Sequence, residues 1–377
     1  MCSLSLSASV PKRTLRGIGE EMNQVLFGLI LFFMSLTVSH PSWSAGAKAL
    51  KVACFDAGEQ IPALVINDRS FYAESPVRFE DALYYVEFSK DRVMKFSSFF
   101  GDPRGGAAGL LAPTHEVLWS EAGCGPAAVM PFDGGFYVAC YSSHKLVYLS
   151  ATGQKLSEVL SPVGAFAGAT PPMAPNDFVS DAFGGFYFTS SGEFNASQET
   201  PIAGRVFYFS SRGDLHEVAS GIHYSNGIAL SAAGDTLLVA EHLKNRIRSY
   251  RVVAPGVLDS EFKIFADLQK LFPWKNGTPS AYLGPDGMRL NQGVLFIAQY
   301  AGSRILKMRE DGTVIGSIDL RSDFPNTTNI WVDHNHLYIT AVRDDSAPGS
   351  HAVYPAIVLR IADLKLTERA HLVCEIK

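Results

Sequence analysis

The sequence predicts an all-β fold, a six-bladed β-propeller with four-stranded antiparallel blades around a central channel. Three observations lead to this fold class. The chain of 377 residues contains 33 glycines and 20 prolines, which many tight turns require. It also contains 25 phenylalanines and 14 tyrosines, and aromatic residues favour strands. Finally, one pattern of turn, apolar strand, turn and apolar strand recurs about every 50 residues, a period typical of propeller blades.

Each copy of this repeat opens with a small polar or proline-containing turn. The first two strands of the six copies are expected at 74–77 and 82–86, 125–129 and 135–139, 175–179 and 185–189, 225–229 and 236–240, 285–288 and 294–298, and 328–332 and 336–340. Most copies continue into a third strand, as at 91–96, 245–250 and 303–308. A double β-sandwich also has many short strands, but it would not repeat a polar residue at the head of each unit.

Composition and charge narrow the function classes. The chain is 47% hydrophobic and 18% charged, as expected for a folded globular protein. Its 32 basic and 37 acidic residues are scattered, with no run of Lys and Arg that could follow a phosphate backbone. We therefore expect no nucleic-acid partner, and we expect a monomer that acts on a small molecule.

The N-terminal segment has the pattern of an export signal. Basic residues precede an apolar run at 25–38, which is shorter than the about 20 residues that a membrane-spanning helix needs. Small residues at 45–47 then supply a cleavage site. We expect a leader at 1–47 and the propeller at 48–377, with a periplasmic or secreted protein and no stable membrane span after leader removal. The alternative is a membrane anchor that is retained after export.

Four cysteines remain after the expected leader, Cys54, Cys124, Cys140 and Cys374, and an oxidising compartment would allow two disulfides. Three pairings are open. We expect Cys54–Cys374, because a closed ring brings the two ends of the chain together, and Cys124–Cys140, because these residues flank one predicted hairpin. The alternative is that all four are buried free thiols.

Residues at the start of the first strands carry the chemistry, because in a propeller these strands line the channel and their starts converge. Blade by blade, this position gives Glu74, an apolar entry near Pro126, Asn176, Asn226, Asp286 and Asn329. Two carboxylates and several amide oxygens suit one hard divalent cation, with Ca²⁺ as the first choice and Mg²⁺, Mn²⁺ or Zn²⁺ as alternatives. For any one of these motifs alone an ordinary turn is the better explanation, whereas four of them at equivalent positions favour the metal site.

These motifs resemble those of the senescence marker protein/gluconolactonase (regucalcin-like) family of six-bladed β-propeller hydrolases, over most of the chain after the leader. The resemblance implies that Glu74, Asn176 of a Pro-Asn-Asp turn, Asn226 of an Asn-Gly turn and Asp286 of a Pro-Asp-Gly-Met turn bind a catalytic metal. It also implies a gluconolactonase-like hydrolase of carboxylic esters. A Cys54–Cys374 closure would be similar to that of the paraoxonase branch of these propellers.

Two positions depart from the family pattern. The usual Glu-Gly-Pro-Val-Trp opening is Glu-Ser-Pro-Val-Arg here, so we expect Arg78 to place a cation near the first ligand and to contact substrate. The basic residue that sugar-lactone members carry two positions before the Asn of the Pro-Asn-Asp turn is Ala174 here. This difference disfavours a sugar lactone as the substrate.

The resulting hypothesis is an exported calcium-dependent hydrolase of a lactone or similar ester, in which the metal polarises the carbonyl and activates water. Asp286 or Asp177 would take the proton, and His223, Asn329 and Arg78 would contact the substrate. The main alternative is a non-catalytic propeller that calcium stabilises and that binds a ligand or a protein partner. A condensing propeller similar to strictosidine synthase would not need the metal.

Overall fold

The computed structural model describes residues 49–97, 113–160, 172–273, 280–333, 336–343, 354–363 and 365–377. The predicted leader at 1–47 lies outside the described residues. Ala49–Lys377 forms one compact unit. Its described helices are short: the 3₁₀ turns η1 (Phe88–Lys90) and η2 (His242–Lys244), and the α-helix α1 (Leu268–Leu271). None of the helices described is long and apolar enough to cross a membrane.

The described strands form six sheets, and the prediction of an all-β fold is confirmed. The first sheet contains β4 (Ala73–Phe79), β5 (Ala82–Glu87), β6 (Arg92–Ser97) and β7 (Thr114–Ser120). The second contains β8 (Pro126–Phe132), β9 (Gly135–Cys140), β10 (Lys145–Ser150) and β11 (Lys155–Leu160). The third contains β12 (Pro175–Ser180), β13 (Phe186–Ser190), β14 (Gly204–Phe209) and β15 (Leu215–Ile222). The fourth contains β16 (Ser225–Leu230), β17 (Thr236–Glu241), β18 (Arg246–Ala254) and β19 (Val257–Asp267).

The last two sheets also contain strands from the N-terminal part of the unit. The fifth has seven strands: β20 (Gly284–Asn291), β21 (Val294–Tyr300), β22 (Arg304–Arg309), β23 (Val314–Arg321), β27 (His371–Ile376), β1 (Val52–Asp56) and β2 (Glu59–Ile61). The sixth contains β24 (Asn326–Val332), β25 (His336–Val342), β26 (Pro355–Ala362) and β3 (Ala63–Phe71). β3 therefore supplies the outermost strand of a sheet that the C-terminal part of the chain begins.

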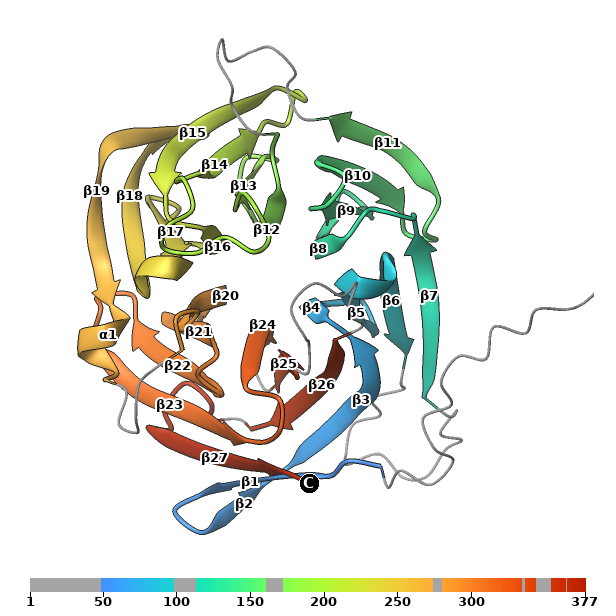
Figure 1. Ribbon diagram of the computed structural model, residues 1–377, viewed down its shortest axis with the longest axis vertical. Coiled ribbons are helices and arrows are strands. Elements are labelled where there is room, and N and C mark those ends of the chain that lie inside the picture. The colour runs from blue at the N-terminus through green and yellow to red at the C-terminus, as the bar shows by residue number, and fades with distance from the viewer. Residues whose placement is uncertain are drawn as a thin grey trace, which may run out of the picture. The chain divides into compact units, whose positions relative to one another are not determined.

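The sheets are arranged around a common centre, with the first strand of each sheet innermost (Figure 1). Each of these inner strands contacts the inner strand of the next sheet, from β4 through β8, β12, β16 and β20 to β24, and β24 contacts β4 in turn. This is the arrangement of a β-propeller.

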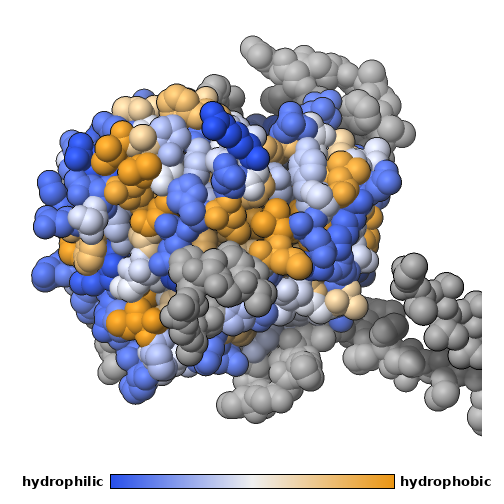
Figure 2. Space-filling model, turned by 90° about the horizontal axis from the view of Figure 1, so that it is seen from above, coloured by the Kyte–Doolittle hydropathy of each residue, from blue (hydrophilic) through white to orange (hydrophobic). Residues whose placement is uncertain are grey.

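Burial follows the same radial order. Every residue of β5, β9 and β13 is buried, because the second strand of a sheet packs against neighbouring sheets on both faces. Most residues of the outer strands β7 and β11 are exposed. A view onto the rim of the molecule accordingly shows separate apolar areas among polar ones (Figure 2). The continuous apolar runs in the sequence are thus explained by second strands that are covered on two sides.

Both expected disulfides are present, Cys54–Cys374 and Cys124–Cys140. The first joins β1 to β27, which pair antiparallel, with Cys54 opposite Cys374. β27 in turn pairs in parallel with β23. Two disulfides are consistent with an oxidising compartment.

Candidate functional site

Each inner strand has a β-bulge near its start, and this bulge sets the level of the candidate site. In all six sheets the inner strand advances by three residues between two pairing positions where the second strand advances by only two, so the inner strand contains one extra residue. In β12, for example, Pro175 pairs with Ser190 and Phe178 pairs with Phe188. A bulge re-aims side chains and is frequent beside functional sites. The end of the ring at which the inner strands start is called the mouth below.

The register defines one equivalent bulge position in every sheet. From the first sheet to the sixth, its residues are Ser75, Ala127, Asn176, Asn226, Asp286 and Thr328. Glu74 comes one position earlier, and Ser75 after it adopts a left-handed φ of 48°. The register therefore brings the predicted residues Asn176, Asn226 and Asp286 to one level, with Glu74 adjoining it.

In the sixth sheet the register selects Thr328, not Asn329, for this level. Asn329 is buried, and its Oδ1 accepts a hydrogen bond of 2.8 Å from the backbone N–H of Ile330. Its equivalent in the third sheet is Asp177, whose Oδ1 accepts the same bond from Phe178 at 2.9 Å. The expectation that Asn329 heads its strand thus differs from the structure by one residue, because the turn signal alone does not show where the bulge lies.

Glu74 and Asp286 are close enough to repel each other. Burial, followed by the charges of Asp286 and Asp177, raises the pKa of Glu74 well above its usual value. Burial, followed by the charge of Asp177, likewise raises the pKa of Asp286, although hydrogen bonds from the Asn226 side chain and the Gly287 backbone oppose this shift. Side-chain hydrogen bonding to Thr328 also favours the charged form of Glu74. The site therefore concentrates acidic charge away from water.

Two glycines allow the inner strands to approach closely at this level. A Cβ added to Gly227 would lie 2.1 Å from the carbonyl oxygen of Asp286. A Cβ added to Gly287 would lie 2.1 Å from the side chain of Asn329. Any larger residue would push the strands that carry Asn226 and Asp286 apart. Close packing between strands thus explains why a glycine follows Asn226 and Asp286 in the Asn-Gly and Pro-Asp-Gly motifs.

Asp177 is engaged differently from Glu74 and Asp286. Arg289 forms a bidentate salt bridge with it, from Nη1 to Oδ2 at 3.0 Å and from Nη2 to Oδ1 at 3.1 Å. Asp177 is 1% exposed. Because both carboxylate oxygens are occupied, the contacts of Asp177 favour a positioning role over the proton transfer expected from the sequence.

Sequence reasoning missed several tyrosines that surround the acids. The hydroxyls of Tyr141 and Tyr224 lie 3.3 Å apart. Tyr72 and Tyr224 both interact electrostatically with Glu74 and Asp286, and burial is the largest cause of their raised pKa values. Tyr72 adopts φ of 49° and Tyr224 φ of 62°, both left-handed. A bulky residue with positive φ beside a ligand-type residue is strained, but the sequence alone does not reveal φ.

His242, in η2, was also missed. Its ring lies 5.6 Å from that of Tyr224 and 5.8 Å from that of Tyr300. Nδ1 donates to the carbonyl oxygen of Pro285 at 3.1 Å, which fixes the backbone directly before Asp286. Burial lowers the pKa of His242 to about 4 despite this bond. The ring is therefore neutral at physiological pH and acts as a positioning group.

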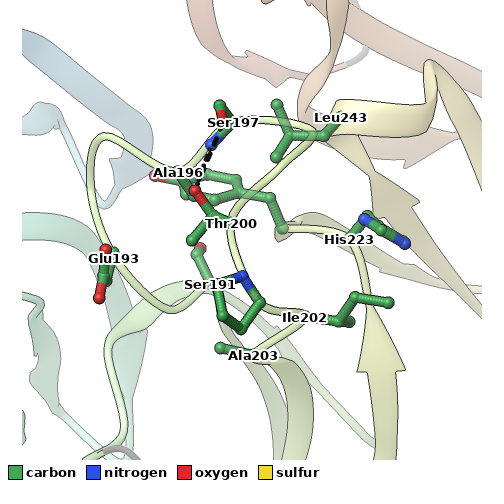
Figure 3. Close-up of a pocket in the computed structure, with 11 residues that line it drawn as sticks. Ser191, Glu193, Ala196, Ser197, Thr200, Ile202, Ala203, His223 and Leu243 are labelled. Carbon is green, nitrogen blue, oxygen red and sulfur yellow. Dashed lines mark hydrogen bonds between the residues drawn. The ribbon is translucent and has the colours of Figure 1, made fainter.

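The other two residues predicted to contact the substrate, Arg78 and His223, do not point to the acidic site. Arg78 lies near the far end of β4 from Glu74, where Nη1 is 3.6 Å from Asp333 and Nη2 donates to the Glu80 carbonyl at 3.3 Å. His223 lies in a loop beside a pocket, but its ring points away from the other side chains drawn in Figure 3. Burial and the charge of Lys244 lower the pKa of His223. The surroundings of Arg78 and His223 thus do not favour a contact between either residue and a substrate bound at Glu74 and Asp286.

Metal ligation here would depend on mixed oxygen donors. The described residues contain no group of three or more His, Cys, Asp or Glu side chains that could hold an ion. Two carboxylates with Asn176 and Asn226 are a different kind of donor set, and hard cations accept amide oxygens. Two buried like charges are costly unless a cation lies between them. The residues present therefore fit one hard divalent cation.

Fold and geometry define the class of protein: a β-propeller whose inner strands gather carboxylates and amides at the mouth. The chain belongs to the SMP-30/gluconolactonase/LRE-like family, whose model matches residues 72–343. The resemblance inferred from the sequence motifs is confirmed. Lactonase drp35 of Staphylococcus saprophyticus is 27% identical over 199 residues, which cover 51% of this chain and 56% of that protein. The match thus spans about half the length of this curated relative.

Solved structures support the fold. A luciferin-regenerating enzyme has a TM-score of 0.60 at 17% identity and covers 81% of this chain and 96% of its own. A gluconolactonase from Xanthomonas campestris has a TM-score of 0.56 at 19% identity, with coverages of 80% and 89%. A calcium-binding regucalcin from Agrobacterium tumefaciens has a TM-score of 0.57 at 15% identity, with coverages of 80% and 95%. At such identities the likeness concerns the fold alone.

Proposed function

We propose that this protein is an exported, metal-dependent hydrolase that opens a lactone or cleaves a similar ester. In this proposal the six sheets are the blades of a closed six-bladed propeller, and one divalent metal, with Ca²⁺ as the first choice, binds at the mouth of its central channel. The single observation that carries the proposal is the pair of neighbouring acids, half-buried Glu74 and buried Asp286. The neighbours that shift the pKa of these two carboxyls are other acids, a hydroxyl, an amide and backbone groups. The nearby cation Arg289 instead forms its salt bridge with Asp177.

The chain's own residues have distinct roles in the proposed reaction. Glu74, Asn176, Asn226 and Asp286 hold the metal, which when bound supplies a Lewis acid for the ester carbonyl and for water. Asp286 accepts the proton of the water that attacks the carbonyl carbon. The proton then passes to the alkoxide released when the carbon–oxygen ester bond breaks, so that a lactone gives a hydroxy acid. The salt bridge between Asp177 and Arg289 links β12 to β20 at the site.

Family membership and the lactonase relative support the reaction class. The test is a panel of aliphatic, sugar and acyl-homoserine lactones, each assayed with and without a chelator. The Glu74→Gln and Asp286→Asn variants should remain folded, and kcat/KM should fall at least about a hundredfold in each. The reason is that each substitution replaces a charged metal ligand by a neutral one. Glu80→Gln is the matched control, since Glu80 is exposed at the end of the strand that carries Glu74.

Full activity in either site variant would refute the assignment of the site. If metal stabilises the protein but no lactone or ester in the panel is hydrolysed, the hydrolase proposal fails. That outcome would favour the non-catalytic alternative, in which the metal only rigidifies the propeller.

A further inference from the structure

The mouth is polarised between its two sides. Every sheet except the second contributes an oxygen donor at or beside the bulge level, namely Asn176, Asn226, Asp286, Thr328 and Glu74. In the second sheet the equivalent bulge position is Ala127, which is buried and packs in one cluster with Tyr141 and Ala174. The apolar side therefore lies at the second sheet and extends to Ala174, which precedes β12 of the third sheet. A ligand that fits both sides must therefore have a polar part and an apolar part.

Two half-buried aromatic rings extend the apolar side. Phe88 and Phe194 pack against the cluster that contains Ala127. Their rings are stacked, with centroids 4.9 Å apart and an interplanar angle of 16°. The Phe194 ring also makes edge contacts with Tyr72 at 5.7 Å and Tyr141 at 6.0 Å. Phe88 comes from η1 of the first sheet, whereas Phe194 belongs to the third. We call Phe88, Tyr141 and Phe194 the aromatic wall.

Phe194 reaches this position because its loop, residues 191–203 between β13 and β14, is held on both sides of Phe194. On one side the hydroxyl of Tyr141 donates to the carbonyl of Gly192 at 2.7 Å. On the other, Gln198 bonds to the Leu243 carbonyl and accepts from Lys244 at 2.9 Å. Within the loop, the backbone N–H of Ser197 donates to Thr200 Oγ1 at 2.9 Å, the dashed contact in Figure 3. The loop therefore presents Phe194 in a defined position.

The aromatic wall adjoins the acidic site directly. Tyr141 of the wall contacts Tyr224, whose hydroxyl is 3.3 Å away. Tyr72, which touches both wall phenylalanines, lies directly before β4 and two residues before Glu74. The reacting and non-reacting parts of one small molecule can thus contact the acids and the wall at the same time.

We infer that Phe194 is a specificity-determining residue: the aromatic wall binds the non-reacting body of the substrate and selects lactones or esters with an aliphatic or aryl body over polyhydroxylated ones. This inference rests on the proposed hydrolase function. An apolar body removes the exposed faces of Phe88 and Phe194 from water, whereas a polyhydroxylated body would leave hydroxyls without partners against this wall.

The test compares δ-decalactone with δ-valerolactone, which has the same ring without the alkyl tail, and with glucono-δ-lactone. The wild-type protein should show the highest kcat/KM for δ-decalactone. Phe194→Ala should reduce the ratio of the decalactone to the valerolactone kcat/KM by about tenfold, through loss of contact with the tail. Phe194→Leu should keep most of that ratio. Phe183→Ala is the control, because Phe183 lies on a turn of the same sheet and is 69% exposed.

A second measurement separates this inference from the proposed function. Calorimetric titration with the δ-lactam that carries the same alkyl tail, which is not hydrolysed, should show about tenfold weaker binding to Phe194→Ala than to the wild type. An unchanged substrate ratio and unchanged lactam affinity in Phe194→Ala would overturn the inference, even if lactones are hydrolysed. Loss of lactam affinity without any lactone turnover would support the wall and refute the hydrolase.

Discussion

Carboxyl groups at the mouth differ in what balances their charge. Asp286 is buried and the neighbouring Glu74 is half-buried, and desolvation together with neighbouring acids raises the pKa of both. Asp177 has both oxygens on Arg289, whose guanidinium also lies 6.0 Å from the ring of Trp331. Asp177 with Arg289 is thus a neutral pair, which leaves the other two acids as the charge that a cation would compensate.

Breaking the Asp177–Arg289 pair should destabilise the protein strongly. Asp177→Asn and Arg289→Met should each lower the free energy of unfolding by about 3 kcal/mol, because each leaves a buried partner uncompensated. The double variant should recover part of this loss. Urea unfolding measures these values, with the exposed pair Arg251 and Asp259 as the matched control that should show little change. Additive losses in the double variant would contradict the coupling.

Sequence motifs located three of the four predicted ligands at one level but could not locate every neighbour. Asn176, Asn226 and Asp286 lie in turn motifs that are weak singly but indicative together, and the bulge is the same in each of their sheets. Thr328 and Tyr224 carry no such signal. The sequence indicates Asn329 by its place at a strand entry and His223 by its place three residues before Asn226. The residues at the bulge and at the left-handed φ are instead their neighbours Thr328 and Tyr224, which only the strand register and the backbone reveal.

At the level of elements, one hairpin connection recurs in three sheets. Glu87, Glu241 and Gln299 end the second strands and accept hydrogen bonds from Arg92, Arg246 and Arg304, which begin the third strands. Each connection contains a residue with left-handed φ, at Asp91, Asn245 and Ser303. Glu241 also accepts from the backbone N–H of His223 at 3.1 Å. These buried acceptors hold the loops that carry Phe88, Tyr224 and His242 at the mouth.

Glu241 should make stability depend on pH. Burial alone would raise its pKa, but hydrogen bonds from Arg248 and Arg246 outweigh burial and lower the pKa to about 2. A carboxyl with a lowered folded-state pKa stabilises the fold above its unfolded-state pKa and loses this effect as the pH falls through the folded value. Glu241→Gln should therefore cost on the order of 3 kcal/mol near pH 7 and less as the pH approaches 2. Urea unfolding of both proteins across this range measures the difference, and a constant difference would contradict the assignment.

At the scale of the whole unit, strands from opposite ends of the chain pair with each other. β3 pairs with β26, and β1 pairs with β27. Arg369 reinforces this pairing through Asp56 at 2.6 Å and Glu59 at 3.1 Å. The repeat pattern predicted the first two strands of every sheet, since their periodicity is local. It could not predict that β3 completes the sixth sheet, because pairing between distant strands leaves no periodic signal.

The two disulfides should differ in their effect on stability. Cys54 and Cys374 are 320 residues apart, whereas Cys124 and Cys140 are 16 apart. In the chain-entropy model the longer closed loop restricts the unfolded chain more, by about 2–3 kcal/mol. The Cys54→Ser/Cys374→Ser variant should therefore be less stable in urea unfolding than the Cys124→Ser/Cys140→Ser variant. Equal losses would show that the strand pairing, not the covalent link, holds these strands together.

Calorimetric titration of Ca²⁺ into chelator-treated protein tests the central claim most directly, that Glu74 and Asp286 share one cation with neighbouring amides. We predict one binding site per chain in the wild type and none in Asp286→Asn, with both proteins folded. We also predict that Asp286→Asn is more stable than the wild type when metal is absent, because the buried member of a pair of neighbouring acids is then neutral. Wild-type Ca²⁺ binding in Asp286→Asn, or no binding of any divalent cation to the wild type, would contradict the account.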